Sequence, residues 1–514
     1  MSETDGRGRR RHVSSAARSA SSMAATEKNC QAAPQPFTPG ELESQLLSLE
    51  RNEKSYRMAG AFTALILIVL PALILLIPSG GSVPYHLAAL FGGYAMVRRS
   101  SAQRPLARDE RLACAGFGAF AVTILISLVD TGASREAVRE LDVLLRPLWA
   151  IPIVYLFIRA RPPEGLLWFG VALGAILAGL NALHEITVAG DYVRASGGTS
   201  AITYGNSALA MGFIAAVGFS YFRGLGKPYL VVPAAALLLG MLASVLSGSR
   251  GGWLALPALA ILLLWHCWRL RYRRLSVAGA LSFGAVVSLA VMLPQSGVMS
   301  RIDMAVSGVE MYMQDTAVLA DSAVGQRLEL WRAAWDMFMQ RPLLGGGIGH
   351  TFKDFLREGT AAGNYDPAIA VHTMPHNVLL DVLALRGLVG LAGVLALWLA
   401  LGCVFFKAAR EESARLRTLG TAGLILLVSY AFFGLTDSVM DYGPPLVLFC
   451  FYSALIVHLI ARARLEAAQA WAVAPTGSTL PSDDAIRALC NADAPSTETT
   501  GARAGAHDAQ GEVR

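Results

Sequence analysis

Residues 58–78 read MAGAFTALILIVLPALILLIP and contain no charged side chain. Similar uncharged runs of about 20 residues recur along the chain, the length that a helix needs to cross the roughly 30 Å hydrocarbon layer of a bilayer. Because lipid offers no hydrogen-bond partners, such runs are expected to be helices. An outer-membrane barrel would show short segments that alternate apolar and polar residues, and the sequence has none. The predicted fold class is an all-α polytopic membrane protein.

The composition of the whole chain agrees with this prediction. Of its 514 residues, 54% are hydrophobic and only 16% are charged, whereas a globular domain carries about 25% charged residues. The mean hydropathy is +0.48. These values exclude a soluble enzyme, a disordered protein and a nucleic-acid-binding protein as descriptions of the whole chain. The net charge of +6 is better explained by the positions of the cations than by an anionic partner.

We predict about twelve transmembrane helices, with one large loop between spans 9 and 10. The predicted spans are 58–78, 82–97, 112–130, 143–158, 165–185, 204–222, 229–247, 252–268, 275–293, 387–406, 418–436 and 443–461. The chain then divides into a largely disordered tail at 1–57, spans 1–9 at 58–293, the loop at 294–386, spans 10–12 at 387–461, and a disordered tail at 462–514.

The distribution of Lys and Arg predicts the orientation. The loops that follow even-numbered spans hold 17 of these residues, whereas the opposite short loops hold four. Cytoplasmic loops carry the excess of positive charge, so both termini are predicted to be cytoplasmic and the large loop to face outward.

The cysteines offer no sign of a metal site. Two of the six lie in the tails and four within predicted spans, and the sequence has no CxxC pair and no Cys/His spacing suited to zinc. We therefore predict neither a metal nor a cofactor.

The large loop contains an amphipathic pattern from Gly325 to Gln340. Arg341-Pro342 ends it, and the glycines at 345–347 form a turn. This helix is expected to lie on the membrane surface or to cap the bundle, and the alternative is that Trp331 or Trp335 stacks on a sugar. The apolar residues at helical spacing are Leu328, Trp331, Trp335 and Phe338.

Two arginines are candidates for binding an anion. Arg250 lies at the outward end of a helix in Ser-Gly-Ser-Arg-Gly-Gly, where small residues expose N–H groups that could cradle phosphate oxygens; it could equally extend to lipid headgroups. Arg327 falls in the first turn of the amphipathic helix, where it could be a solvated charge paired with Glu329 or Asp321. Two guanidinium groups at one membrane surface could together clamp a diphosphate.

His376 is the candidate general base. Three of the nine histidines, His350, His372 and His376, lie in the loop. Because Pro375 is tolerated at a helix start, His376 is expected in the first turn of the next helix, where the helix N-terminus favours the neutral, basic imidazole. A histidine at an interface can also be purely structural.

Together these segments resemble the O-antigen ligase family, membrane glycosyltransferases that share a ligase/polymerase core. The resemblance is carried by Ser249-Arg250-Gly251-Gly252, by Arg327-Leu328-Glu329-Leu330-Trp331, by RPLLGGGIG at 341–349 and by Pro375-His376-Asn377, in that order within a twelve-span frame. It implies a GT-C-like fold. The motifs cover roughly residues 200–400.

In that family the ligase moves an O-antigen polysaccharide from undecaprenyl diphosphate to the lipid A-core, at the periplasmic face of the bacterial inner membrane and without metal. The resemblance implies that Arg250 and Arg327 engage the donor diphosphate. It implies that His376 deprotonates the acceptor hydroxyl, in a direct displacement that inverts the anomeric carbon.

Three further residues are secondary candidates. Arg194, in Arg-Ala-Ser-Gly-Gly after span 5, could join the same anionic site. His372 could assist His376 or be a polar loop residue, and Asn377 could orient or cap the helix that re-enters the membrane.

Three other functions compete with the ligase. An O-antigen polymerase and a protein O-oligosaccharyltransferase would use the same donor with a different acceptor. A transporter of lipid-linked sugars would need polar or ionisable residues at mid-membrane depth, and the predicted spans are nearly free of charges, with Arg146 the main exception. The expected partners are thus the lipid-linked donor, the lipid A-core acceptor and membrane lipids, with no nucleic acid.

Overall fold

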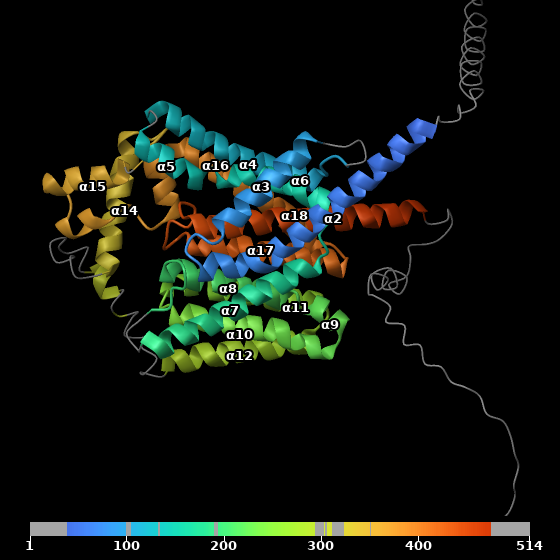
Figure 1. Cartoon of the computed structure of the whole chain (residues 1–514). Helices are drawn as coiled ribbons and strands as arrows, with labels where there is room; N and C mark the ends of the chain where they lie inside the picture. The colour runs from blue at the N-terminus through green and yellow to red at the C-terminus, as the bar shows by residue number, and fades with distance from the viewer. Residues whose placement is uncertain are drawn as a thin grey trace, which may run out of the picture. The chain divides into compact units, whose positions relative to one another are not determined.

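The structure, a computed structural model, describes residues 39–98, 104–131, 134–189, 194–292, 303, 306–310, 323–349 and 351–473. Both predicted tails lie mostly outside these residues, as do His350 and Asp321. Every regular element in the described residues is helical, which confirms the all-α class (Figure 1). The elements are α2 (Pro39–Leu76), α3 (Ser82–Val97), α4 (Arg108–Thr131), α5 (Arg135–Leu144), α6 (Arg146–Ala160), α7 (Gly165–Ala189), α8 (Ala201–Val217), α9 (Phe219–Leu225), η1 (Lys227–Leu230), α10 (Val231–Leu246), η2 (Arg250–Ala255), α11 (Leu256–Arg269), α12 (Arg273–Met292), α14 (Ala323–Gln340), α15 (Thr351–Ala361), η5 (Pro367–Val371), α16 (Val378–Arg410), α17 (Ala414–Phe433) and α18 (Gly443–Val473).

Nine helices in the described residues are long and apolar enough to cross a membrane. The pair α8 and α9, bent by 51°, makes a tenth if it counts as one span. The chain is therefore a polytopic membrane protein, but the predicted count of twelve is not confirmed. Segment 82–97 forms α3, whose 16 residues are fewer than in any of the nine, and segment 275–293 lies in α12, which is not among them.

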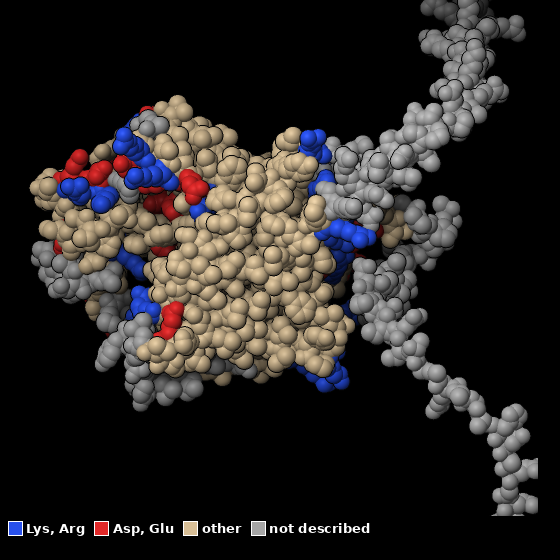
Figure 2. Space-filling view, in the orientation of Figure 1, with Lys and Arg blue, Asp and Glu red and all other residues tan. Residues whose placement is uncertain are grey.

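The helices and the loop elements belong to one compact unit that ends at Ala461, and the residues from Arg462 onward form a second. Within the first unit the long helices lie side by side, and α14 and α15 lie beyond one end of them, which we call the loop end (Figure 1). Figure 2 shows an uncharged middle on the visible face, mixed charges at the loop end, and Lys and Arg at the opposite end. Arg269, the last residue of α11, donates to the carbonyl of Arg410 at the end of α16, and Arg417 of α17 donates to the carbonyl of Arg269.

The first unit is centred on α18, of which residues 445–461 are all buried. Small residues let the surrounding helices approach one another closely, as is typical of membrane bundles. A side chain at Gly170 of α7 would collide with the backbone of α2, and one at Gly420 of α17 would collide with the backbone of α16. Helix association here depends on close backbone contact.

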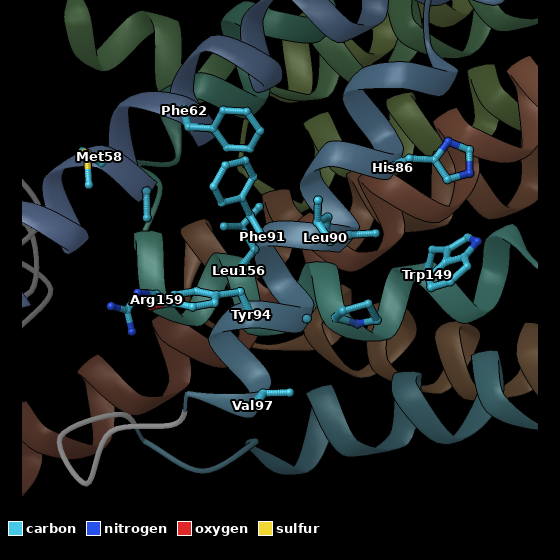
Figure 3. Close-up of a pocket in the computed structure, with 14 residues that line it drawn as sticks. Met58, Phe62, His86, Leu90, Phe91, Tyr94, Val97, Trp149, Leu156 and Arg159 are labelled. Carbon is cyan, nitrogen blue, oxygen red and sulfur yellow. The ribbon is translucent and has the colours of Figure 1, made fainter.

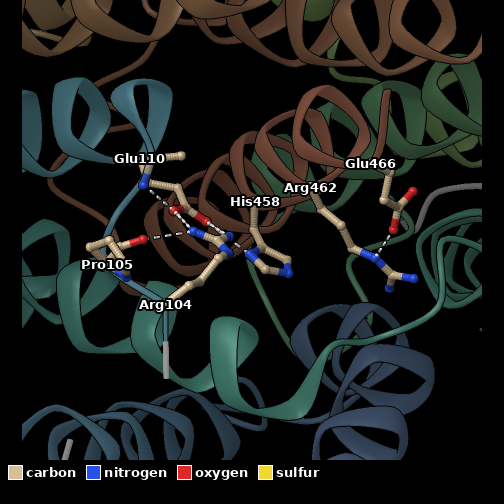
Figure 4. Close-up of polar contacts among 7 residues, drawn as sticks. Arg104, Pro105, Glu110, His458, Arg462 and Glu466 are labelled. Carbon is tan, nitrogen blue, oxygen red and sulfur yellow. Dashed lines mark hydrogen bonds and ion pairs between the residues drawn. The ribbon is translucent and has the colours of Figure 1, made fainter. Parts of the chain in front are cut away.

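A buried ion pair joins α4 to α18 (Figure 4). Glu110 is inaccessible to solvent and accepts two hydrogen bonds from Arg104, with N···O distances of 2.6 and 2.7 Å. It also accepts from Ala107 N at 2.8 Å, and its Oε1 lies 2.9 Å from His458 Nδ1. Every carboxylate lone pair that faces the protein is therefore used, which is the condition under which a buried charge is tolerated.

Replacing Glu110 with alanine should lower the free energy of unfolding by about 3 kcal/mol, the lower end of the cost of breaking a buried pair, because Arg104 is partly exposed and can turn toward water. The measurement is the thermal unfolding midpoint in detergent. The control is Glu466→Ala, which removes the partly exposed pair Arg462–Glu466 and should cost less than about 1 kcal/mol. Equal shifts for the two variants would contradict the assignment.

Candidate functional site

The turn between α10 and η2 presents Arg250 at the loop end. Ser247 Oγ donates to Ser244 O at 2.8 Å, and Ser249 N donates to Ser247 Oγ at 3.2 Å. Gly248 has a φ of +63°, which favours glycine, so the chain can fold back tightly at this point. Arg250 is the first residue of η2, and its side chain is exposed above the turn.

Arg194 lies against the same turn. Its Nε donates to Ser247 O at 2.8 Å, and a Cβ added to Gly248 would lie 3.2 Å from Arg194 Nε. The backbone next to Arg194 also bonds to the end of α10, because Ala195 N donates to Leu246 O at 3.1 Å. The structure thus brings Arg194 and Arg250, 56 positions apart in the sequence, to one turn.

The same turn packs against two other elements through its glycines. A side chain at Gly251 would collide with Thr436, in the turn between α17 and α18. A side chain at Gly252 would collide with Asn206 of α8, whose Oδ1 accepts from Ser249 Oγ at 3.2 Å. These glycines therefore allow the backbone that carries Arg250 to contact the α17–α18 turn directly.

The α17–α18 turn also holds His376. Val378 N donates to Gly434 O at 2.8 Å and Asn377 Nδ2 donates to Leu435 O at 3.2 Å, so the two backbones run alongside each other. This pairing places His376 Nδ1 3.3 Å from Asp437 Oδ1. The Asp437 side chain is 2% exposed and that of His376 is 24% exposed, so the imidazole connects a buried carboxylate to the surface.

The prediction that His376 lies in the first turn of the next helix is wrong. Helix α16 begins at Val378, and Asn377 is its N-cap, with Oδ1 accepting from the amides of residues 379 and 380 at 3.0 and 3.2 Å. His376 precedes the cap with a φ of +53°, a conformation that side chains rarely adopt. The cap and the pairing with the α17–α18 turn hold it there. Asn377 is thus the capping residue that the sequence suggested.

His372 contacts His376 edge to face, with ring centroids 5.7 Å apart. Partial burial of His372, and then the charge of His376, lower the pKa of His372 below its usual value. His372 is therefore the neutral neighbour of His376 near pH 7.

Arg327 reaches this region through α14. The helix begins at Ala323, two residues before the predicted start, so Arg327 is its fifth residue and lies just beyond the first turn. Trp331, one turn further on the same face, donates from Nε1 to Pro375 O at 3.1 Å. Glu329, one suggested partner of Arg327, is instead bonded to Arg332 at 3.2 Å. Arg327 is half-buried on the α14 face that contacts the residue before His376.

The predicted apolar stripe of α14 is confirmed only in part, because Phe338 is buried whereas Leu328 and Trp331 are half-buried. Trp335 is 49% exposed, and the buried face is formed by Leu330, Ala333, Ala334 and Met337. These residues pack against Phe352 and Leu356 of α15, Tyr365, Ile369 of η5 and Ala384 of α16. Small alanines lie at the closest helix contacts, whereas the bulkier tryptophans remain at the rim. Helix α14 therefore caps the bundle, one of the two expected placements.

A continuous set of contacts joins the three main candidates. The glycine beside Arg250 packs on Thr436, the neighbouring Asp437 contacts His376, and the carbonyl before His376 accepts from Trp331, one turn from Arg327. Arg194 joins at the Arg250 turn, and His372 and Asn377 flank His376. The segments that carry Arg194, Arg250 and His376 thus meet at the α17–α18 turn, and Arg327 lies one helical turn from the hydrogen bond between Trp331 and Pro375.

Two acidic residues of that turn are absent from the sequence predictions. Asp437 contacts His376, and Asp441 Oδ1 lies 3.5 Å from Nη2 of Arg386, whose side chain is 1% exposed. Tyr442 donates to Met374 Sδ at 2.9 Å, and burial followed by the charges of Asp437, Asp441 and Asp381 raises its pKa. The available signal was the polar run Thr436-Asp437-Ser438 between two apolar spans.

The glycine-rich segment after α14 completes a break in α16. Gly387 has φ 60° and ψ −156° inside α16, which interrupts the helical hydrogen bonds. The amides of Gly346 and Gly347 donate to the carbonyls of residues 384 and 385 at 2.8 and 2.9 Å. The amides of residues 388 and 389 donate to the carbonyls of Pro342 and Leu343 at 2.9 and 3.1 Å. Segment 342–347 thus supplies hydrogen-bond partners to the backbone groups that the break leaves without helical ones, because lipid could not supply them.

Among the described residues, no group of three or more His, Cys, Asp or Glu side chains could hold a metal ion. The site is instead a set of guanidinium groups beside a histidine–carboxylate pair. Such a set can bind an anion and accept a proton.

The fold is that of a polytopic membrane protein, and the candidate site places arginines beside a histidine–carboxylate pair at the loop end. Residues 234–395 match the family described as O-Antigen ligase, a stretch that contains Arg250, Arg327 and His376. A Haemophilus influenzae protein described as "Uncharacterized protein" is 21% identical over 339 residues, which are 66% of this chain and 83% of that protein. The match over residues 234–395 supports membership of the O-antigen ligase family and a membrane glycosyltransferase role of the ligase or polymerase type.

Gly387→Ala should destabilise the protein by about 1–3 kcal/mol, because the new side chain would take an essentially glycine-only conformation and collide with the backbone of Leu343. The matched control is Gly402→Ala on the same helix, where the added Cβ meets only Leu427 at 3.4 Å and alanine favours helix. Unfolding midpoints in detergent compare the two. A Gly387→Ala midpoint equal to that of wild type would show that the break is not required.

Proposed function

We propose that this protein is an O-antigen ligase. It transfers O-antigen polysaccharide from undecaprenyl diphosphate to the lipid A-core oligosaccharide, without metal and with inversion. The observation that carries the proposal is the gathering of Arg250, Arg327 and the His376–Asp437 pair around one turn at the loop end. The family match over residues 234–395 supports the reaction class.

The pairing with Asp437 suits His376 to act as the base. Because the carboxylate faces Nδ1, the neutral imidazole carries its proton on Nδ1, and Nε2 retains the lone pair. Nε2 can then accept the proton of the acceptor sugar hydroxyl. The buried carboxylate orients the ring and stabilises the imidazolium that forms.

Arg250 and Arg327 act on the donor. As the bond between the anomeric carbon and the diphosphate oxygen breaks, negative charge grows on that oxygen, and fixed cations stabilise it. Guanidinium groups remain charged at all relevant pH values and bind pairs of phosphate oxygens in a fork. Arg194 lies on the Arg250 turn and would add a third cation to the same site.

The reaction is a single displacement. The acceptor oxygen forms the new bond to the anomeric carbon, the diphosphate leaves with the bonding electrons, and the hydroxyl proton passes to His376. The products are the lipid A-linked polysaccharide and undecaprenyl diphosphate. Attack opposite the leaving group inverts the anomeric carbon.

The location follows from charge. Arg269, Arg410 and Arg417 cluster where α11 and α16 end and α17 begins, at the end opposite the site, and positive charge flanking membrane spans stays in the cytoplasm. We therefore assign the loop end to the periplasmic face of the bacterial inner membrane, with both termini cytoplasmic. The donor, the lipid A-core acceptor and the membrane lipids are the expected partners, and no nucleic acid takes part.

The first test is a reconstituted transfer assay in EDTA, with undecaprenyl-diphosphate polysaccharide as donor and lipid A-core as acceptor. Wild type should form lipid A-linked product, and His376→Ala should lower the rate by about 100-fold or more, the usual contribution of a positioned base. Asp437→Asn should lower kcat by about 100-fold as well, because the amide no longer stabilises the imidazolium. Asp354→Asn, on the exposed face of α15, is the matched control and should leave the rate unchanged.

Other results of this assay would overturn specific parts of the proposal. Longer lipid-linked chains without lipid A product would identify a polymerase, and transfer to Ser or Thr of an added protein would identify a protein glycosyltransferase. Equal rates for wild type and His376→Ala would remove the base assignment and keep the ligase.

The arginine roles predict a graded series. Arg250→Gln and Arg327→Gln should each lower the transfer rate by about 100-fold or more, whereas the lysine variants should retain more activity, because they keep the charge and lose the fork. Arg357→Gln, an exposed cation of α15, is the control and should retain the wild-type rate. Equal rates for the glutamine and lysine variants would indicate that charge at these positions does not matter.

A further inference from the structure

A groove runs along the side of the bundle, away from the residues of the proposed catalytic site. Its volume is 1140 Å³, and its walls come from α2, α3 and α6 (Figure 3). Neither Arg250, Arg327 nor His376 lines it. The proposed function gives this groove no role.

Two adjacent glycines in α3 create the hollow. A side chain at Gly92 would collide with the carbonyl of Pro152, so α3 and α6 make backbone contact there. A Cβ at Gly93 would meet nothing within 4 Å, so the absence of a side chain at this position leaves an open space beside α3. Gly93 therefore lines the groove as an unfilled position, next to the close contact at Gly92.

The groove follows one face of α3. Its lining residues on that helix recur at helical spacing from His86 to Val97, a length of about 17 Å at roughly 1.5 Å per residue. One leaflet of a bilayer is about 15 Å deep, half of the roughly 30 Å hydrocarbon layer. The groove therefore has the depth of one lipid leaflet.

The two ends of the groove differ in charge. Along its length the walls are apolar and include Phe62 and Phe91, whose rings lie 4.5 Å apart. His86 and Trp149 lie at one end, and Arg159 lies at the other beside Tyr94 (Figure 3). Arg159 belongs to the last turn of α6 and is 8% exposed, so its guanidinium is held at the wall rather than extended into solvent.

We propose that this groove binds one glycerophospholipid with an anionic headgroup. One acyl chain lies along α3 over Gly93, and the phosphate lies against Arg159. An apolar channel one leaflet deep fits a fatty-acyl chain, and a fixed cation at one end fits a phosphate. A polyprenyl chain is longer than one leaflet, so the donor lipid fits the groove less well.

The test is native mass spectrometry on the full-length protein, stripped of lipid in detergent and titrated with dipalmitoyl phosphatidylglycerol or dipalmitoyl phosphatidylethanolamine. Wild type should bind one phosphatidylglycerol about fivefold more tightly than phosphatidylethanolamine, the ratio expected for one cation near an anionic headgroup. Gly93→Leu should abolish binding of this one lipid, because leucine occupies the open space beside α3. Gly284→Leu on α12, another glycine with open space around it, should bind as wild type.

The charge is tested separately from the cavity. Arg159→Gln should bind both lipids equally, and Arg159→Lys should restore the preference for phosphatidylglycerol. The unfolding midpoint checks the fold of each variant, and leucine in place of a helical glycine should raise it. The proposal fails if Gly93→Leu binds like wild type or if wild type shows no headgroup preference.

Discussion

A backbone amide inside a bilayer has no water to bond, and the architecture at the loop end depends on how one broken helix meets that constraint. Gly387 interrupts α16, and the segment after α14 supplies the missing partners, two amides for the carbonyls before the break and two carbonyls for the amides after it. This exchange fixes segment 342–347 against the start of α16. It thereby places α14, which brings Arg327 and Trp331 toward the residues that precede α16.

The chemistry depends on a second backbone pairing, between the residues just before α16 and the α17–α18 turn. This pairing holds His376 outside the helix and next to a buried carboxylate, so the tautomer of the ring follows from its surroundings. The same turn receives Gly251, and through it the exposed Arg250. One short turn thus organises groups from three regions of the chain, and the gathered cations and base are consistent with transfer from a lipid diphosphate.

Particular residues show why some sequence predictions were confirmed and others were wrong. Uncharged runs such as 58–78 predict helices reliably, because lipid permits few other structures. The capping role of Asn377 was also foreseen, since it depends on local geometry. The apolar stripe of α14 was predicted only in part, because its burial is decided by partners from α15, η5 and α16, which cover Leu330, the two alanines and Met337 rather than Trp335. His376 was predicted inside the first turn of α16 but precedes its N-cap, for a similar reason: the carboxylate that it contacts, Asp437, lies 61 positions away.

By itself the sequence determined the all-α membrane class, the resemblance to the O-antigen ligase family and the identity of the candidate arginines and histidine. Hydrophobic length, charge bias and short motifs are local properties, and local properties can be read from a chain. Only the tertiary structure revealed that Arg194 bonds to the turn that carries Arg250 and that Asp437 contacts His376. It also revealed that the glycine-rich segment forms hydrogen bonds with the backbone on both sides of the break in α16. These contacts join residues far apart in the chain, and helix packing, with the need to satisfy every buried backbone group, decides which of them meet.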